Sequence, residues 1–435
     1  MTTVKQILAL NRFEAGTMVD GPLAERIRHR QDTFGAASVL FYEEPIEMVR
    51  GEGVYLYDAD GRRYLDVYNN VPSVGHCHPQ VVEAIARQAA TLNIHTRYLN
   101  RTVEAYAERL LATFPAPLSN LVMTCTGSES NDLAMRIAES ATGGKGFVVT
   151  RAAYHGNTAA VTGISPSSLK SRPVAPHVRT VPAPAGPDVA ATFAADVERA
   201  IAGLKESGFG FAGLVVDTIF SSDGIYADPP GFLAQAASVV AREGGLFIAD
   251  EVQPGFGRTG GGLWGFGRHG IVPDIVTMGK PMGNGFPMGG VVTRPELLAA
   301  FCEETGYFNT FGGNPVAAAA GLAVLDVIRN EQLVENAASA GAYLRDGLVA
   351  LKADRPEIAE VRGAGLFIGL DFETEDGRPD TKRASEAING LKQRGILIGA
   401  AGLYGNTLKI RPPLCFTPAH ADALLSALSA TLAAA

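Results

Sequence analysis

The middle of the chain alternates between short apolar runs and longer segments in which apolar residues recur at helical spacing. Each run is apolar on both faces, which is typical of a strand buried in a parallel sheet. The pattern therefore predicts an α/β architecture, with a mostly parallel sheet covered by helices. The predicted strands are residues 121–125, 147–150, 214–217, 246–250, 275–278 and 290–293.

The two ends of the chain follow other patterns. Residues 1–35 are predicted to be helical and then irregular, and the turn at residues 58–61 joins two extended runs into a predicted hairpin. Residues 181–195, rich in alanine and proline, predict a surface loop. The other predicted elements are helices at 79–92 and 103–114, an alanine-rich helix from Pro315, strands at 366–372 and 407–410, and helices near 384–394 and 418–435.

A chain of 435 residues is too long for one small core. We expect an N-terminal segment (1–74) that joins the small domain, a large domain (75–325) and a small α+β domain (326–435). The formal net charge of −8 disfavours nucleic acids and anionic membranes as main partners. No apolar run approaches a membrane span, the N-terminal run is too short for a signal peptide, and the four cysteines show no pairing pattern. These features predict a cytoplasmic protein.

Two buried runs end in groups that suggest a cofactor. Lys280 closes one run and precedes a glycine-rich stretch, so its amine is expected at the mouth of the sheet, where burial lowers the pKa of a lysine. Asp250 ends the run before it, and a buried carboxylate needs a partner. A protonated pyridine nitrogen is such a partner, and this pair is what pyridoxal phosphate requires. A surface lysine at a strand end is the simpler alternative.

Three other segments fit the same cofactor. Gly127 and Ser128 open a predicted helix, whose free amides and positive dipole end bind phosphate; helix capping explains them equally well. Tyr154 and His155 follow a predicted strand, where an aromatic side chain stacks on a flat ring or simply packs in a loop. Thr310, before a glycine pair, offers a hydroxyl to a phosphate or belongs to a helix start.

Other motifs are set aside. The glycines of residues 208–213 precede a strand, and those of 255–260 lead into more glycines, so neither has the strand–turn–helix context of an NAD site. His76, Cys77 and His78 have no further ligand cluster nearby, so no metal is expected.

Together these segments resemble the class III (ω-) aminotransferase family of fold-type I pyridoxal-phosphate-dependent transferases, from about residue 35 to the C-terminus. The resemblance implies a large domain with a mostly parallel seven-stranded sheet and a smaller α+β domain. It also implies a homodimer with shared active sites. The matching motifs are residues 127–132, 154–156 and 250–260, the Lys280 segment, and residues 310–315.

The resemblance also implies a role for each site residue. Lys280 would form the imine with pyridoxal phosphate, and Asp250 would bind the pyridine nitrogen. In a transaminase, pyridoxamine phosphate would be the aminated form of the cofactor. The remaining cofactor-binding residues would be Val252 and Tyr154 on the two ring faces, Gln253 near the ring hydroxyl, His155, and Gly127, Ser128 and the partner subunit's Thr310 at the phosphate.

The substrate side departs from the family pattern. Lys409 stands where many members that act on amino acids have an arginine, and a lysine binds as a point charge instead of a planar fork. Asp217 stands where the family often has a glutamate. Several segments resemble the branch of phospho-lyases that act on O-phosphoethanolamine or phosphohydroxylysine. On that branch Arg97, Lys409 and Arg411 are candidates to hold a substrate anion, and Asp217 is a further substrate-site candidate.

Two reactions fit these residues. Transamination between an amine or amino acid and an oxo acid is expected first, because it is the commoner activity of the family. The alternative is a phospho-lyase that eliminates phosphate and ammonia. Lys280 serves as the base in both.

Replacing Lys280 with alanine tests the assignment that both reactions share. The variant should lose the absorbance of the imine between the lysine and the cofactor, because no other amine is expected there. The absorption spectrum of the purified protein measures this. A yellow, active variant would contradict the assignment.

Overall fold

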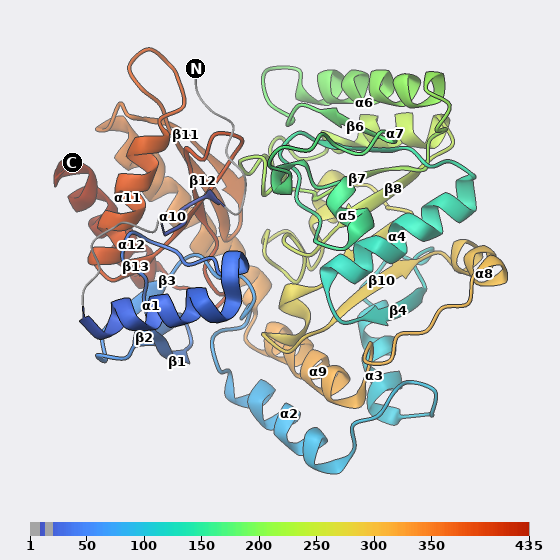
Figure 1. Ribbon diagram of the computed structural model, residues 1–435, viewed down its shortest axis with the longest axis horizontal. Coiled ribbons are helices and arrows are strands. Elements are labelled where there is room, and N and C mark those ends of the chain that lie inside the picture. The colour runs from blue at the N-terminus through green and yellow to red at the C-terminus, as the bar shows by residue number, and fades with distance from the viewer. Residues whose placement is uncertain (1–8, 14–20, 435) are drawn as a thin grey trace.

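The computed structural model describes residues 9–13 and 21–434. A seven-stranded sheet is the core of one half of the molecule, on the right in Figure 1. In spatial order the strands are β4 (Asn120–Thr124), β10 (Gly289–Thr293), β9 (Ile275–Met278), β8 (Leu246–Asp250), β7 (Gly213–Val216), β5 (Phe147–Thr150) and β6 (Val178–Val181). Only β10 runs antiparallel to its neighbours, and the other pairs are parallel. The predicted fold class is confirmed.

Side chains on alternate positions of these strands enter two different cores, as period-two strand geometry requires. On β5, Phe147 and Val149 lie in one core and Val148 lies in the other. Helices α4 (Gly127–Thr142) and α8 (Pro295–Glu304) cover the first face, and α6 (Val189–Glu206) and α7 (Leu233–Arg242) cover the second (Figure 1). This double cover explains why the strand sequences are apolar throughout.

Two expectations for this domain need correction. Strand β6 was not predicted, because Arg179 and Thr180 interrupt its apolar pattern at the edge of the sheet. The predicted surface loop at 181–195 is wrong from Val189 onward, where α6 begins and buries Phe193. Its alanines favour a helix once one face has a core to cover.

Two four-stranded sheets form the other half of the molecule. One contains β1 (Met48–Glu52), β2 (Tyr55–Asp58), β3 (Arg63–Asp66) and β13 (Ile396–Leu397); the other contains β11 (Ile358–Ala364), β12 (Phe367–Phe372), β15 (Thr407–Ile410) and β14 (Gly399–Ala401). The β2–β3 hairpin is confirmed, and β13 pairs with β3. Strands from the N-terminal and C-terminal parts of the chain therefore lie side by side in one sheet (Figure 1). The expected domain boundaries stay a prediction.

Helices complete both halves. The predicted helices match α2 (Pro79–Thr91), α3 (Arg101–Leu111), α9 (Pro315–Asn330), α11 (Thr381–Gln393) and α12 (Pro418–Ala434), while α10 (Leu333–Ala353) was not predicted. Within residues 1–35, α1 covers Gly21–Phe34, and residues 1–8 and 14–20 lie outside the described residues. None of the described helices is both long and apolar enough to cross a membrane.

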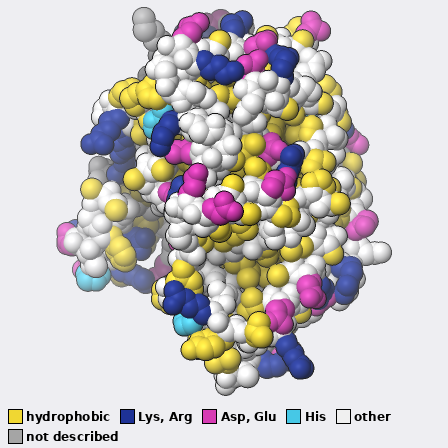
Figure 2. Space-filling model, turned by 90° about the vertical axis from the view of Figure 1, so that its right-hand side faces the viewer, with side chains coloured by type: hydrophobic (Ala, Val, Ile, Leu, Met, Phe, Trp, Pro, Cys, Tyr) yellow, Lys and Arg dark blue, Asp and Glu magenta, His cyan; other side chains and the backbone are white. Residues whose placement is uncertain are grey.

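The sheet brings the predicted site together. The loops after β5, β7 and β8 leave the same edge, because these strands are parallel neighbours. On the face seen in Figure 2, basic and acidic side chains are mixed, with hydrophobic side chains exposed between them. That face does not form the single basic surface that a nucleic acid requires.

Candidate active site

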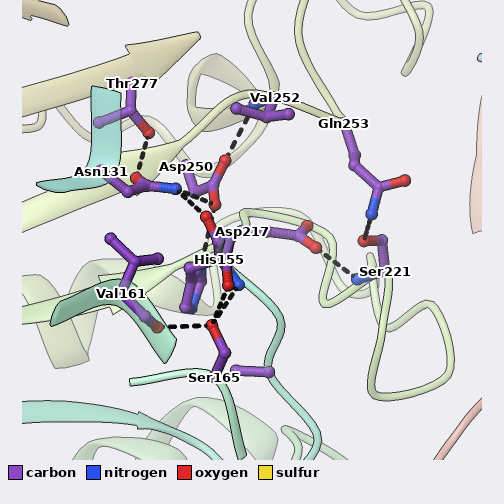
Figure 3. Close-up of polar contacts among 12 residues, drawn as sticks. Asn131, His155, Val161, Ser165, Asp217, Ser221, Asp250, Val252, Gln253 and Thr277 are labelled. Atoms are coloured by element: carbon purple, nitrogen blue, oxygen red, sulfur yellow. Dashed lines mark hydrogen bonds and ion pairs between the residues drawn. The ribbon is translucent and has the colours of Figure 1, made fainter. Parts of the chain in front are cut away.

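The Asp250 carboxylate is buried at the end of β8, with 4% of the residue exposed. Its Oδ1 accepts a hydrogen bond from the Val252 amide (3.1 Å). Its Oδ2 accepts from Asn131 Nδ2 (3.0 Å) and faces His155 Nδ1 at 2.7 Å (Figure 3). An ionised carboxylate only accepts, so we assign the proton of this contact to His155 Nδ1. One acceptor position, on Oδ1, is left for a donor in the cavity.

Lys280 follows β9 and begins a short 3-10 turn (Lys280–Gly283) with a left-handed φ of 29°. Its ammonium group makes no hydrogen bond or ion pair with any residue that the structure describes. Burial and the nearby charge of Arg411 lower the pKa of Lys280 from its ordinary value of 10.5 to about 8. A larger share of the amine is therefore neutral near physiological pH, as a nucleophile or a base requires.

The start of α4 is capped and can also bind an anion. Thr126 Oγ1 accepts from the Glu129 amide (3.1 Å), and Glu129 Oε2 accepts from the Cys125 amide (2.9 Å), so capping by Thr126 and Glu129 is confirmed. The amides of Gly127 and Ser128 precede the first intrahelical bond and stay free for an anion. Ser128 Oγ accepts from the Asn157 amide (3.1 Å) and keeps its own proton to donate.

Three loops approach one another so closely here that two positions have room only for glycine. A Cβ atom on Gly127 would lie 2.8 Å from Val252 Cγ2. One on Gly156, at φ +143°, would lie 2.5 Å from Ser128 Oγ. Both contacts are shorter than van der Waals packing allows, so larger residues would push the loops apart.

A cavity of about 300 Å³ opens between these loops. It contains a buried carboxylate, an amine of lowered pKa and a free helix N-terminus, the three groups that pyridoxal phosphate needs. These residues fit the cofactor, and nearly all the predicted cofactor residues line the cavity. They are Gly127, Ser128, Tyr154, His155, Asp250, Val252, Gln253 and Lys280, together with the substrate candidate Asp217.

Four predicted residues are not among those that line this cavity: Arg97, Thr310, Lys409 and Arg411. Arg97 is exposed, and its guanidinium group lies 4.1 Å from the centre of the Phe308 ring. Thr310 is also exposed. Thr310 was expected to act in the partner subunit, so its role, like that of Arg97, stays a prediction.

Lys409 and Arg411 lie at the end of the small-domain strand β15. Lys409 is 4% exposed, and its Nζ lies 5.5 Å from the centre of the Phe367 ring. Within the described residues it has no hydrogen bond and no ion pair. Burial lowers the pKa of Lys409, and the charges of Arg411 and Lys280 lower it further.

Arg411, in contrast, is held by protein groups. Its Nη1 donates to Asn70 Oδ1 (3.0 Å) and to Gln253 Oε1, and its guanidinium group lies 4.6 Å from the centre of the Tyr68 ring. Gln253 Nε2 donates to Ser221 Oγ at 2.8 Å (Figure 3). The position of Gln253 near a ring hydroxyl stays a prediction.

Asp217 is fixed by backbone donors. Its two carboxylate oxygens accept from the Ile219 amide (3.0 Å) and the Ser221 amide (2.7 Å). Burial raises the pKa of Asp217, and the nearby Asp250 raises it further. Sequence reasoning did not assign a role to Asn131, Thr277, Ser221 or Asn70. Of these four, only Asn131 could have been found from the sequence, because it belongs to the motif at residues 127–132.

The chain is similar to known proteins over nearly its whole length. The family model described as aminotransferase class-III matches residues 41–432. Alanine–glyoxylate aminotransferase 2 homolog 2 of Arabidopsis thaliana is 41% identical, over 94% of this chain and 87% of the relative. Ethanolamine-phosphate phospho-lyase homolog 1 of Caenorhabditis elegans is 38% identical, over 94% and 93%. A solved phospholyase from Arthrobacter in complex with phosphoethanolamine is 44% identical with a TM-score of 0.91, covering 94% of this chain and all of that one.

The lowered pKa of Lys280 predicts how its reactivity depends on pH. Only the neutral amine is nucleophilic, and it predominates above the pKa. In cofactor-free protein, acylation of Lys280 should therefore rise through pH about 8 and then level off. Peptide mass spectrometry after brief labelling measures this, with the 87%-exposed side chain of Lys382 as a reference in the same digest. A Lys280 profile that still rises at pH 10 would contradict the prediction.

Proposed function

This chain belongs to the class III aminotransferase family, and from that premise we propose that it is a pyridoxal-phosphate-dependent phospho-lyase. Its substrate would be a small primary amine with a phosphate on the neighbouring carbon, such as O-phosphoethanolamine. The likeness to the Arthrobacter phospholyase supports this choice. The observation that carries it is the buried amine of Lys409, which has no hydrogen bond or ion pair among the described residues.

A buried ammonium group without a partner costs several kcal/mol. Lys409 is buried, and the two cations that lower its pKa, Arg411 and Lys280, add positive charge around it. Arg411 Nη1 already donates to Asn70 and Gln253, whereas the amine of Lys409 has no hydrogen bond or ion pair among the described residues. A substrate dianion next to Lys409 would raise its lowered pKa again and pair with the protonated amine. A phosphate monoester carries close to two negative charges at neutral pH, and a lysine binds it as a point charge.

The residues of the cavity divide the remaining work. Pyridoxal phosphate, when bound, withdraws electrons from the carbon that bears the substrate amine and makes its proton acidic. The neutral Nζ of Lys280 accepts that proton, which its lowered pKa allows. Asp250 holds a donor at its free Oδ1 position, and the start of α4 holds a phosphate group at Gly127 and Ser128.

The reaction balances with one water molecule. The bond between the substrate's β-carbon and the phosphate oxygen breaks, and its electron pair leaves with phosphate. Water then replaces the amine nitrogen, so that O-phosphoethanolamine yields acetaldehyde, ammonia and inorganic phosphate. Lys409 stabilises the leaving phosphate by its charge.

Transamination remains the second candidate. The relatives named alanine–glyoxylate aminotransferase 2 support it, because they match nearly the whole chain. In that reaction Lys409 would bind a carboxylate of an amino or oxo acid. Lys280 would take up the substrate proton and return it, and pyridoxal phosphate, when bound, would supply the group that carries the amine between the two substrates.

We also propose that the enzyme is a homodimer. The segments next to Arg97 and Thr310 expose apolar side chains, with 62% of Tyr98, 97% of Leu99 and 72% of Phe311 accessible. Apolar surface of this kind marks a contact with another protein. A second copy of the chain would bury it and bring Thr310 towards the neighbouring cavity.

Phosphate release from O-phosphoethanolamine, without any oxo acid, distinguishes the two reactions. The cofactor-loaded enzyme should release phosphate and ammonia in equal amounts over many turnovers, with an unchanged cofactor spectrum. Ethanolamine, which lacks the phosphate, is the control and should give no ammonia. If no phosphate is released, but simple amines convert the cofactor to its aminated form and pyruvate reverses this, the enzyme is a transaminase.

Replacing Lys409 with methionine tests its role at the phosphate. The loss of a charge-assisted contact should lower kcat/KM for O-phosphoethanolamine about tenfold to a hundredfold. Lys392→Met is the matched control, because Lys392 is also buried but already pairs with Glu44 at 2.6 Å. The control should keep kcat/KM near the wild-type value. An equal effect of both substitutions, or none from Lys409→Met, would remove Lys409 from the substrate site.

A further inference from the structure

We propose that Asn131 is a positioning residue of the cofactor site and that Thr277 sets the direction of its side-chain amide. The inference rests on the cofactor of the proposed function but not on the choice between lyase and transaminase. Neither residue is expected to touch the cofactor. Both act through Asp250.

The three side chains form a continuous buried chain of hydrogen bonds. Thr277 Oγ1 donates to Asn131 Oδ1 at 2.7 Å. Asn131 Nδ2 then donates to Asp250 Oδ2 at 3.0 Å and to the His155 carbonyl at 2.7 Å (Figure 3). Thr277, Asn131 and Asp250 are 0%, 1% and 4% exposed, so water does not compete for these bonds.

The direction of the Asn131 amide decides whether it supports the carboxylate. When Nδ2 points towards Asp250 and the His155 carbonyl, its two protons are donated to these two acceptors. Turned by 180°, the amide would place its own oxygen against both acceptors. The Thr277 hydroxyl donates to Oδ1 and so stabilises the first direction, and in a buried chain such bonds strengthen one another.

Asp250 needs this support because its last torsion is soft. Rotation about the terminal bond of an aspartate has broad minima, so a carboxylate held at one point exposes either oxygen. Here Asn131 and His155 both occupy Oδ2, while the Val252 amide occupies one position of Oδ1. This arrangement leaves one acceptor position free on Oδ1 of a residue that lines the cavity. Without Asn131, one acceptor position of Oδ2 would also be free, and it would compete with the free position of Oδ1 for the donor in the cavity.

Asn131 also connects both ends of the site through one helix. It lies on α4, three residues after Ser128, and residues at this spacing share a helix face. The helix that offers its free amides at Gly127 and Ser128 therefore also fixes the carboxylate of β8. Through Thr277 it is joined to β9, the strand that leads into Lys280.

Four variants test this inference: Thr277→Val, which removes the hydroxyl at nearly constant shape; Thr277→Ser, which keeps it; Asn131→Asp, which places an acceptor against Asp250; and Thr293→Val. Thr293 is the matched control, because it is a fully buried threonine of the same sheet whose hydroxyl donates to the Asp274 carbonyl at 3.0 Å, away from the cavity. The dissociation constant for pyridoxal phosphate, the visible spectrum of the bound cofactor and the Tm of the cofactor-free protein are measured for each.

Asn131→Asp should raise the dissociation constant at least tenfold, and Thr277→Val about threefold to tenfold, each with a changed visible spectrum. Thr277→Ser and Thr293→Val should keep the wild-type constant and spectrum, whatever their effect on Tm. The inference is overturned if Thr277→Val binds the cofactor like the wild type, or if Thr293→Val weakens binding as much. A wild-type protein that binds no pyridoxal phosphate would instead refute the proposed function.

Discussion

A single buried carboxylate constrains much of this molecule. Asp250 lies at the end of a strand covered on both faces, where an ionised carboxylate is stable only if donors surround it. Those donors come from a helix, from the loop after β5 and from the turn after β8. They meet only because β5, β7 and β8 are parallel neighbours whose ends share one edge. The sheet order and the site are therefore parts of one arrangement.

The cations of the site have different environments, and this divides their tasks. The guanidinium group of Arg411 is held by Asn70, Gln253 and the Tyr68 ring, so it acts mainly as a fixed charge. Lys280 and Lys409 have no polar partner among the described residues, and burial together with Arg411 lowers the pKa of both. The first is thereby suited to take up a proton. On the proposed function the second takes up a proton when the substrate anion binds, because the anion raises its pKa again.

The sequence predicted those features that depend on local patterns. Six central strands are continuous apolar runs, and Lys280, Asp250 and Gly127 each stand at the end of a strand or the start of a helix. Strand β6 and the start of α6 were missed because their patterns are mixed or alanine-rich. The contacts of Asn131 with Thr277, and of Arg411 with Gln253, join residues more than a hundred positions apart. They depend on side-chain directions that only the folded chain fixes.

The charges of Arg411 and of the bound substrate both act on Lys280, so substrate binding changes the basicity of its amine. Arg411 helps to lower the pKa of Lys280, which increases the neutral share of the amine before substrate arrives but also makes it a weaker base. On the proposed function, a phosphate held by Lys409 adds negative charge close to Arg411 and offsets part of its effect. The pKa of Lys280 then rises as the substrate binds, so the amine becomes a stronger base when a proton must be removed. An arginine paired with a substrate carboxylate, with one negative charge instead of nearly two, would produce a smaller change.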